Sequence, residues 1–325
     1  MTTSLPSSPF VAESNVPPVE FAWLEITPSC QLRCLHCYAG SRPGLGHGQM
    51  SVADWKDVMT SLVAHGTRFV QFIGGEPTIH PHFCELLGEA GRLGLGIEVY
   101  SNLIGITARM WELFVRYQIR LATSFYSDMP AVHDAITMVD GSQQKTLTNM
   151  QKALALGLRV RVGIVRVSRV QDIAATKRLL IESGVEAERI GVDRTRGVGR
   201  GAQLLQEDPV SALCGKCIRS RCAVTASGEV YPCIFSRSFS VGNVLTQDIG
   251  SIITGHVMQT TVRKLSQAFA ERREVAGTAS DRPCDPLDCD PECDPQTFPP
   301  CDPDCCPETV ASCEPSESCK PDNEE

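Results

Sequence analysis

Short apolar runs alternate with longer amphipathic segments between residues 21 and 201. The runs are rich in Val, Ile, Phe and Tyr, which favour strands, whereas the longer segments repeat apolar residues at helical spacing. Six strands are expected at 21–26, 68–75, 96–102, 120–127, 159–167 and 188–194, and helices at 51–66, 82–94, 107–117, 144–157 and 171–184. The first helix is expected to have Ser51 as its N-cap, with Asp54 three residues on, much like a capping box. This alternation predicts a parallel sheet with right-handed crossovers. Such sheets bind ligands at the carboxyl ends of their strands.

The pattern changes after Gly201. Two short strand-like pieces flank a turn at Ser227-Gly228 and predict a hairpin, and a helical stretch follows at 247–273. Beyond Pro283 the chain is a low-complexity repeat of Cys, Asp and Pro, which predicts a disordered tail. The expected organisation is a flexible leader (1–20), a core domain (21–205), a small cysteine-rich extension (206–275) and an acidic tail (276–325).

Composition narrows the class of protein. With 42% hydrophobic residues the chain can bury a core, and no apolar run reaches membrane-spanning length. The first basic residue is Arg33, so no secretory signal is expected and the cytoplasm is the predicted location. The net charge of −8 comes from the tail, since residues 281–325 carry −12 and the remainder +4. Nucleic-acid binding is not expected, because it requires a clustered basic face.

The 16 cysteines divide equally between the body and the tail. Without an export signal, metal ligation is a better interpretation than disulfides. Three of them, Cys30, Cys34 and Cys37, lie in "CQLRCLHCYAG", directly after the first expected strand. One interpretation is a zinc site with His36 or a distant cysteine as fourth ligand. The other is a [4Fe–4S] cluster, in which three thiolates leave one iron open to a substrate or cofactor.

This loop resembles the cluster loop of the radical S-adenosylmethionine (SAM) superfamily. "GGEP", Gly74 to Pro77, follows the second expected strand, as it does in that family. The resemblance implies an α/β fold, a partial (β/α)6 TIM-like barrel. It also implies that the methionine moiety of SAM chelates the fourth iron. Electron transfer into SAM then yields methionine and a 5′-deoxyadenosyl radical, which abstracts hydrogen from a substrate.

Further cofactor-binding residues are implied by the same resemblance. Gly74 and Gly75 let the backbone approach the methionine moiety, and Glu76, before Pro77, takes its ammonium group. Ser101 and Asn102 end the third strand where the family often has Thr-Asn-Gly, with Leu103 in place of the glycine.

Several other positions have two interpretations. Ser124, after the fourth strand, is a candidate for the ribose hydroxyls or a plain buried serine, and Arg194 and Arg196 either face substrate or cosubstrate or are solvated. His133 and Asp134 are expected to cap and order a loop. Cys84, in a helical pattern, is expected to be a small buried hydrophobe.

A second cysteine group comprises Cys214, Cys217, Cys222 and Cys233. The spacing from Cys217 through Gly228 to Cys233 resembles the opening of the SPASM extension, or its shortened twitch form, and implies an auxiliary [4Fe–4S] cluster. The four local cysteines can supply its ligands, or a tail cysteine can replace Cys222. A zinc ribbon is the alternative. The tail matches the complete SPASM pattern only in part, so a second auxiliary cluster and a metal- or partner-binding appendage both stay open.

The resemblance implies a radical SAM enzyme, of oxidoreductase or lyase type, that matures a ribosomally made peptide in natural-product biosynthesis. Its implied partners are the peptide and a low-potential electron donor of flavodoxin or ferredoxin type. The alternative is dehydrogenation or decarboxylation of a small sugar or nucleoside intermediate. This alternative rests on the short stretch before the first strand, which leaves no expected peptide-binding domain there. A non-enzymatic metal carrier would explain the tail but not GGEP.

Overall fold

A computed structural model describes residues 18–215 and 220–277. One sheet runs through it in the order β6-β5-β4-β3-β2-β1-β7-β8-β9. The first six strands are all parallel to their neighbours, which confirms the predicted sheet. They are β1 (Phe21–Thr27), β2 (Phe69–Gly74), β3 (Gly96–Tyr100), β4 (Arg120–Phe125), β5 (Val160–Arg166) and β6 (Ile190–Arg194).

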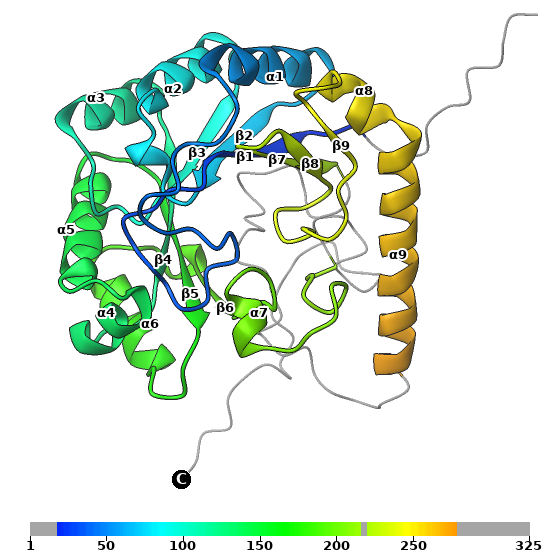
Figure 1. Cartoon of the computed structure of the whole chain (residues 1–325). Coiled ribbons are helices and arrows are strands. Elements are labelled where there is room, and N and C mark those ends of the chain that lie inside the picture. The colour runs from blue at the N-terminus through cyan, green and yellow to red at the C-terminus, as the bar shows by residue number, and fades with distance from the viewer. Residues whose placement is uncertain (1–17, 216–219, 278–325) are drawn as a thin grey trace, which may run out of the picture. The chain divides into compact units, whose positions relative to one another are not determined.

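Helices follow the strands and line the outside of the curved sheet in Figure 1. They are α1 (Val52–Ala64), α2 (Phe83–Arg92), α3 (Ala108–Arg116), α4 (Pro130–Thr137), α5 (Ser142–Ala155) and α6 (Ile173–Glu182), with short 3₁₀ turns at Pro77–Ile79 (η1) and Ala187–Arg189 (η2). The start of α1 is the predicted cap, since Ser51 and Asp54 form a reciprocal capping box. This arrangement is the partial barrel that the sequence predicts.

The strands present two different faces because successive side chains alternate. On β1, Ala22, Leu24 and Ile26 join the hydrophobic core that the sheet forms with the helices. The opposite, inner face carries buried polar groups. There Glu98 of β3 pairs with Arg161 of β5 at 2.7 Å. The pairing neutralises two charges that would each be costly to bury alone.

The sheet continues beyond the predicted barrel. After α7 (Gly201–Leu204), β7 (Arg221–Thr225) pairs in parallel with β1 and forms a hairpin with β8 (Glu229–Tyr231), which confirms the hairpin predicted around Gly228. β9 (Gly242–Asn243) completes the sheet, and α8 (Ile249–Thr254) and α9 (His256–Gly277) follow. The predicted boundary at 205 therefore falls before a strand that extends the core sheet.

Some predictions lie outside the described residues. These are Cys217, most of the leader and nearly all of the acidic tail, with its eight cysteines. Among the residues that the structure does describe, no helix is long and apolar enough to cross a membrane.

Candidate active site at the carboxyl ends of the strands

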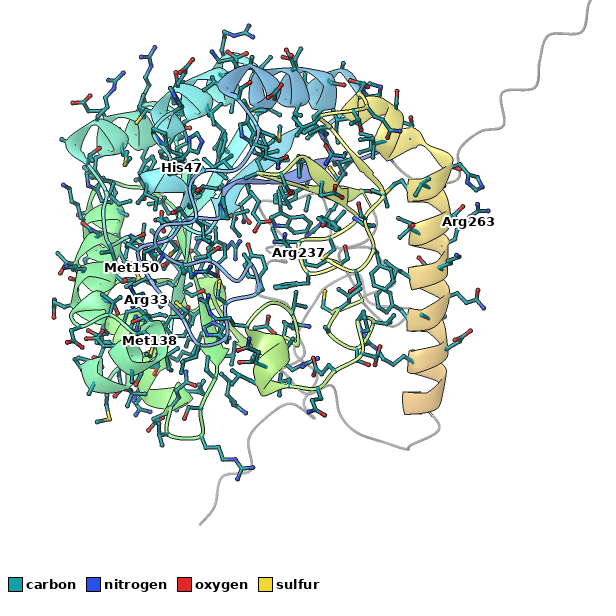
Figure 2. All side chains as sticks on the ribbon, in the orientation of Figure 1. Arg33, His47, Met138, Met150, Arg237 and Arg263 are labelled. Atoms are coloured by element: carbon teal, nitrogen blue, oxygen red, sulfur yellow. The ribbon has the colours of Figure 1, made fainter. Side chains whose placement is uncertain are left out.

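The loop after β1 carries Cys30, Cys34 and Cys37, and backbone hydrogen bonds fix its course. The Cys30 amide donates to the Arg42 carbonyl at 3.3 Å. The amides of Arg33 and Leu35 donate to carbonyls at the C-terminal end of α4, at 3.0 and 3.1 Å. Figure 2 labels Arg33 on this loop beside Met138, which follows α4. The loop is thus closed on itself at Cys30 and attached to the barrel, through α4, at its middle.

Two thiols of this loop, those of Cys30 and Cys34, are poor acids without a metal. Burial raises the pKa of Cys30 well above its usual value and that of Cys34 to about 12. A coordinating metal deprotonates such thiols outright. The Cys30 sulfur also accepts hydrogen bonds from the Leu32 amide at 3.4 Å and from Asn102 Nδ2 at 3.7 Å. Donors of this kind tune an iron–sulfur cluster.

The described residues contain no three His, Cys, Asp or Glu side chains placed to hold one metal ion. A cubane cluster does not need such a set, because each of its irons takes a separate protein ligand.

Unpartnered polar atoms gather at the same loop. His36 Nδ1, Tyr38 Oη, Ser41 Oγ and Arg200 Nη2 are buried and have no hydrogen-bond partner in the described part of the chain. His36 also packs edge-on against Tyr126, with 5.2 Å between ring centroids. Buried polar groups normally find partners. The loop therefore has the character of a lining built around a bound polar group.

The GGEP segment lies directly against the start of the cysteine loop. The Gly75 amide donates to the Thr27 carbonyl at 2.7 Å, and the Glu76 amide to the Ser29 carbonyl at 2.9 Å. A Cβ on Gly74, whose φ is +142°, would lie 2.4 Å from the Thr27 carbonyl oxygen, and one on Gly75 would lie 2.1 Å from that of Ser29. Only glycine permits this approach. Pro77 then begins η1.

Glu76 joins this segment to the end of β3. Its carboxylate accepts hydrogen bonds from the Ser101 hydroxyl and the Asn102 amide, both at 2.7 Å, and from Thr78. Burial raises the pKa of Glu76, and these hydrogen bonds oppose that rise. Glu76 therefore acts as a buried tie between two loops.

Asn102 connects the same network to the cysteine loop. Besides its contact with Cys30, it accepts a hydrogen bond from Gln31 Nε2 at 3.0 Å. Leu103, which stands in place of the family glycine, is fully buried and adopts a left-handed φ of +59°. Leucine therefore adopts the left-handed turn at this position. Asn149 on α5 stabilises the turn by donating a hydrogen bond to the Leu103 carbonyl.

Farther along the sheet edge, the Ser124 and Tyr100 hydroxyls are 2.9 Å apart, so Ser124 is partnered and only half-buried. His133 accepts from the Tyr126 amide, and Asp134 accepts from three groups at the start of α5. The predicted ordering role of these two residues is confirmed. Cys84, on α2, is half-buried against the core.

Arg194, the last residue of β6, and Arg196, just beyond it, both form ion pairs. Arg194 pairs with Glu207 and also donates to the Ser211 carbonyl, and Arg196 pairs with Asp193 at 2.7 Å. The arginine that reaches the cysteine loop is Arg200, whose Nε donates to the Cys34 carbonyl at 2.9 Å. Arg200 was not among the predicted site residues. The signal was "GRG", because two glycines around one side chain indicate close backbone approach.

The described cysteines of the second group differ in their burial and in their position on the fold. Cys222 lies on β7, is fully buried among core hydrophobic residues, and its burial raises its pKa to about 12. Cys233 follows β8, is buried outside that core cluster, and its amide donates to Ser236 Oγ at 2.9 Å. Cys214 is half-buried. The fold therefore directs Cys222 toward the helices that cover the sheet.

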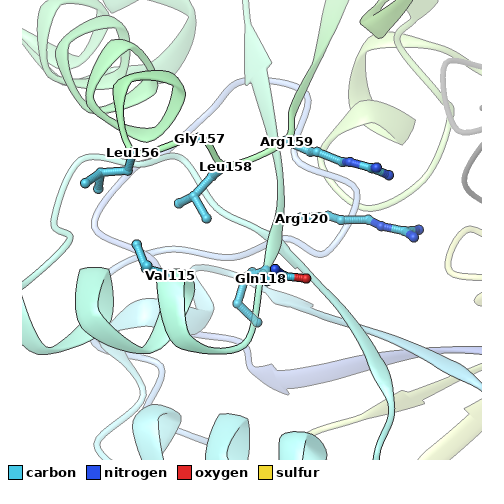
Figure 3. A pocket seen from close by; sticks show the side chains of 8 residues that line it. Val115, Gln118, Arg120, Leu156, Gly157, Leu158 and Arg159 are labelled. Atoms are coloured by element: carbon cyan, nitrogen blue, oxygen red, sulfur yellow. The ribbon is translucent and has the colours of Figure 1, made fainter.

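A pocket of about 510 Å³ lies at the opposite end of β4 and β5. Figure 3 shows its lining, which includes Leu158 and the neighbouring Arg120 and Arg159. In parallel barrels this amino-terminal end serves stability, whereas chemistry occurs at the carboxyl end. The pocket is thus separate from the candidate site.

Two family models match different parts of the chain. One, described as the radical SAM superfamily, matches residues 24–171, which contain the cysteine loop and GGEP. The other, described as an iron–sulfur cluster-binding SPASM domain, matches residues 214–290. The chain therefore contains a radical SAM domain and a SPASM iron–sulfur domain.

Several curated proteins are similar to this chain. It is 28% identical over 197 residues to mycofactocin maturase MftC of Mycobacterium tuberculosis, which covers 58% of this chain and 47% of the relative. It is 25% identical over 289 residues to the subtilosin biosynthesis protein AlbA of Bacillus subtilis, covering 77% and 62%. It is 28% identical over 188 residues to a PqqA peptide cyclase of Streptomyces rochei, covering 55% and 49%. The chain thus spans about half to three fifths of these relatives.

Solved structures share the fold. SuiB of Streptococcus suis, bound to the precursor peptide SuiA, superposes with a TM-score of 0.64 at 14% identity, covering 77% of this chain and 68% of SuiB. The structure of anSMEcpe, with bound SAM and a peptide, gives a TM-score of 0.59 at 13% identity, covering 77% of this chain and 84% of anSMEcpe. The fold of this chain is therefore shared with these solved structures.

The site fits the cofactors of the superfamily, a [4Fe–4S] cluster and SAM. One loop carries three thiols, one buried and two half-buried, that have no disulfide partner among the described residues. Donors directed at the Cys30 sulfur and four unpartnered buried polar atoms lie on this loop or beside it. Two glycines bring the backbone of GGEP against it. The individual ligand and cofactor-binding assignments remain proposals.

Proposed function

We propose that this protein matures a ribosomally made peptide by radical chemistry. The observation that carries the proposal is the pairing of a radical SAM match with a SPASM match in one chain. The relatives that align with it include a mycofactocin maturase, a bacteriocin biosynthesis protein and a peptide cyclase. The structural relative SuiB was solved with a precursor peptide, which supports a peptide as substrate here too.

The roles proposed for the residues follow the contacts of the loop. Cys30, Cys34 and Cys37 bind the cluster, and Gly74 and Gly75 admit the methionine moiety. When bound, the cluster and SAM supply an electron and a carbon–sulfur bond, whose cleavage gives methionine and the 5′-deoxyadenosyl radical. The remaining proposed contacts with SAM come from Glu76, Pro77, Ser101, Asn102, Ser124 and Arg194. Glu76 in addition holds the loops after β2 and β3 together.

The second cysteine group is proposed to hold an auxiliary [4Fe–4S] cluster through Cys214, Cys217 and Cys233. Cys222 is proposed as a core residue, because it lies among hydrophobic side chains on the helix-facing side of β7. A cysteine beyond residue 277 then supplies the fourth ligand. The SPASM match supports this, since it extends through Cys284 and Cys289.

An auxiliary cluster gives the substrate radical an electron acceptor, which favours the oxidoreductase class. With both groups bound, the peptide would lose one hydrogen atom to the 5′-deoxyadenosyl radical, one electron to the auxiliary cluster and one proton to solvent, and this two-electron oxidation would balance the formation of one crosslink. The first cluster requires a low-potential donor of flavodoxin or ferredoxin type. We place the protein in the reducing cytoplasm, where free thiols and clusters persist.

The test is anaerobic turnover of the reconstituted protein with SAM, a reductant and peptides encoded beside its gene. The peptide should lose the mass of two hydrogen atoms per crosslink, in step with 5′-deoxyadenosine release. Deuterium from a labelled peptide should appear in 5′-deoxyadenosine. The Cys30→Ala/Cys34→Ala/Cys37→Ala variant is the control and should do neither. Deuterium transfer from sugar or nucleoside substrates, with every peptide unchanged, would overturn the proposal.

A further inference from the structure

Arg200 contacts the cysteine loop at two points. Its backbone amide donates to the Cys37 carbonyl and its side-chain Nε to the Cys34 carbonyl, each at 2.9 Å. One residue thus holds the carbonyls of two of the three cysteines. Because it lies far along the chain, beyond β6, it ties the loop to the opposite edge of the partial barrel.

The segment around Arg200 is built for this close contact. Gly199 has a left-handed φ of +59°, and a Cβ there would lie 2.2 Å from the Tyr38 carbonyl oxygen. A Cβ on Gly201 would lie 2.0 Å from the Arg196 carbonyl oxygen and 3.3 Å from that of His36. Side chains at either position would push Arg200 away from the loop.

The charge of Arg200 is not matched by a carboxylate in the described part of the chain. Arg194 and Arg196, in the same segment, pair with Glu207 and Asp193. In contrast, Nη2 of Arg200 is buried and has no hydrogen-bond partner among the described residues. A buried guanidinium normally has its donors satisfied. This unmatched group lies beside a loop whose bound cluster carries negative charge on its thiolates and sulfides.

A fixed positive charge favours the reduced form of an adjacent cluster, because the reduced cluster carries one more negative charge.

We propose that Arg200 is a positioning residue that holds the loop through the Cys34 and Cys37 carbonyls and raises the reduction potential of the [4Fe–4S] cluster by its charge. The inference rests on the proposed function, since it requires the cluster at Cys30, Cys34 and Cys37. Arginine suits the role because its planar fork can bind the carbonyl and still direct a second donor elsewhere.

The test is an EPR-monitored redox titration, with and without SAM, of the full chain and its Arg200→Lys and Arg200→Gln variants. Arg109→Gln is the matched control, because Arg109 is an exposed arginine on α3, outside the proposed site, and pairs with Glu112. Iron and sulfide contents are measured for each protein. The Gln variant should keep its iron and show a lower midpoint potential for the SAM-responsive cluster. The Lys variant should stay near the wild type, and the control should not move.

Equal potentials in all four proteins would overturn the proposal. An equal fall in the Lys and Gln variants would also overturn it, because geometry rather than charge would then be responsible. If the Gln variant loses its iron, the Lys variant decides, since retained iron and potential support the charge and lost iron contradicts it. A wild-type protein without a SAM-responsive cluster would instead refute the proposed function, so the two failures can be told apart.

Discussion

The two cysteine groups look equally regular in the sequence, yet the fold treats them differently. Cys30, Cys34 and Cys37 share one loop, which is fixed by α4, by GGEP and by Arg200. Of the second group, Cys222 lies within a strand and Cys233 follows the next one. The first set is therefore presented by a single loop, whereas a strand and a hairpin turn separate members of the second.

The difference shows when the spacing of cysteines along the chain indicates a shared metal site. Within a loop, closely spaced thiols can turn toward one ligand. In a strand, alternation fixes the direction of each side chain, and residue 222 pairs with Ala22 of the core-facing row. Cys222 thus has ligand spacing but the position of a core residue.

The largest expected effect is at the first group. Cys34→Ala should reduce formation of 5′-deoxyadenosine by more than about 100-fold, the upper end of what losing a supporting contact costs a metal site. The measurement is SAM cleavage with dithionite, followed chromatographically. A variant that keeps half its activity and all its iron would show that this loop does not hold the SAM-binding cluster.

A substitution next to the loop should have the next largest effect. Gly75→Ala places a Cβ 2.1 Å from the Ser29 carbonyl oxygen and so forces GGEP from the cysteine loop. We expect at least about tenfold weaker SAM binding and a loss of about 1–3 kcal/mol in free energy of unfolding. Gly105→Ala is the control, because its Cβ would meet nothing within 4 Å. Equal behaviour of the two variants would contradict the close packing.

Two variants can distinguish a core cysteine of the second group from a metal ligand. Cys222→Ala should keep its full iron content and lose about 1–2 kcal/mol of stability, as expected for a small core deletion. Cys233→Ala should lose about four irons per chain, the content of one cubane cluster. The measurements are iron analysis and chemical denaturation. Iron loss in the Cys222 variant would make it a ligand and erase the difference between the groups.

The smallest effect is expected for Asp134, which lies on α4, the helix that holds the first cysteine loop. The Asp134 carboxylate accepts hydrogen bonds from Gly141, Ser142 and Gln143 at 2.6–2.9 Å. Burial opposes its ionisation, but these bonds hold the pKa of Asp134 below its usual range. At pH 7, Asp134→Asn should lower the free energy of unfolding by about 0.5–1 kcal/mol, because solvent screens a carboxylate that is only partly buried.

The sign of the pH dependence follows from that lowered pKa. The stabilisation by Asp134 is complete above the ordinary carboxyl pKa of about 3.9 and is lost as the pH falls through the lower value of the folded state. The difference in free energy of unfolding between the wild type and the Asn variant should therefore shrink below about pH 4. Denaturation curves across pH measure it, with the exposed Asp140→Asn as control. If the variant is still less stable than the wild type in acid, the loss of stability comes from packing and not from the charge of Asp134.

The repeating pattern was sufficient to predict the six parallel strands, the cap at Ser51 and the hairpin at Gly228. It did not predict α4, which is only eight residues long and too short for periodicity to stand out. Nor did it place β7 beside β1, because that pairing joins segments about 200 residues apart in the chain.

The same distinction between local motifs and contacts of distant segments applies to the candidate site. Residues in contiguous motifs, such as the cysteine loop and GGEP, were predictable and do lie together. Arg200 was not, since only the fold brings it to Cys34. Leu103 also departs from the family pattern, yet burial and contacts with α5 hold it in the left-handed turn.

The central claim is that the two cysteine groups hold separate clusters. Iron and acid-labile sulfide per chain, after anaerobic reconstitution of the Cys30→Ala/Cys34→Ala/Cys37→Ala variant, test it most directly. The account predicts that about four irons remain, the content of one cubane cluster, and that SAM cleavage is lost. A variant that retains no iron would contradict it, because the second group would then hold no cluster.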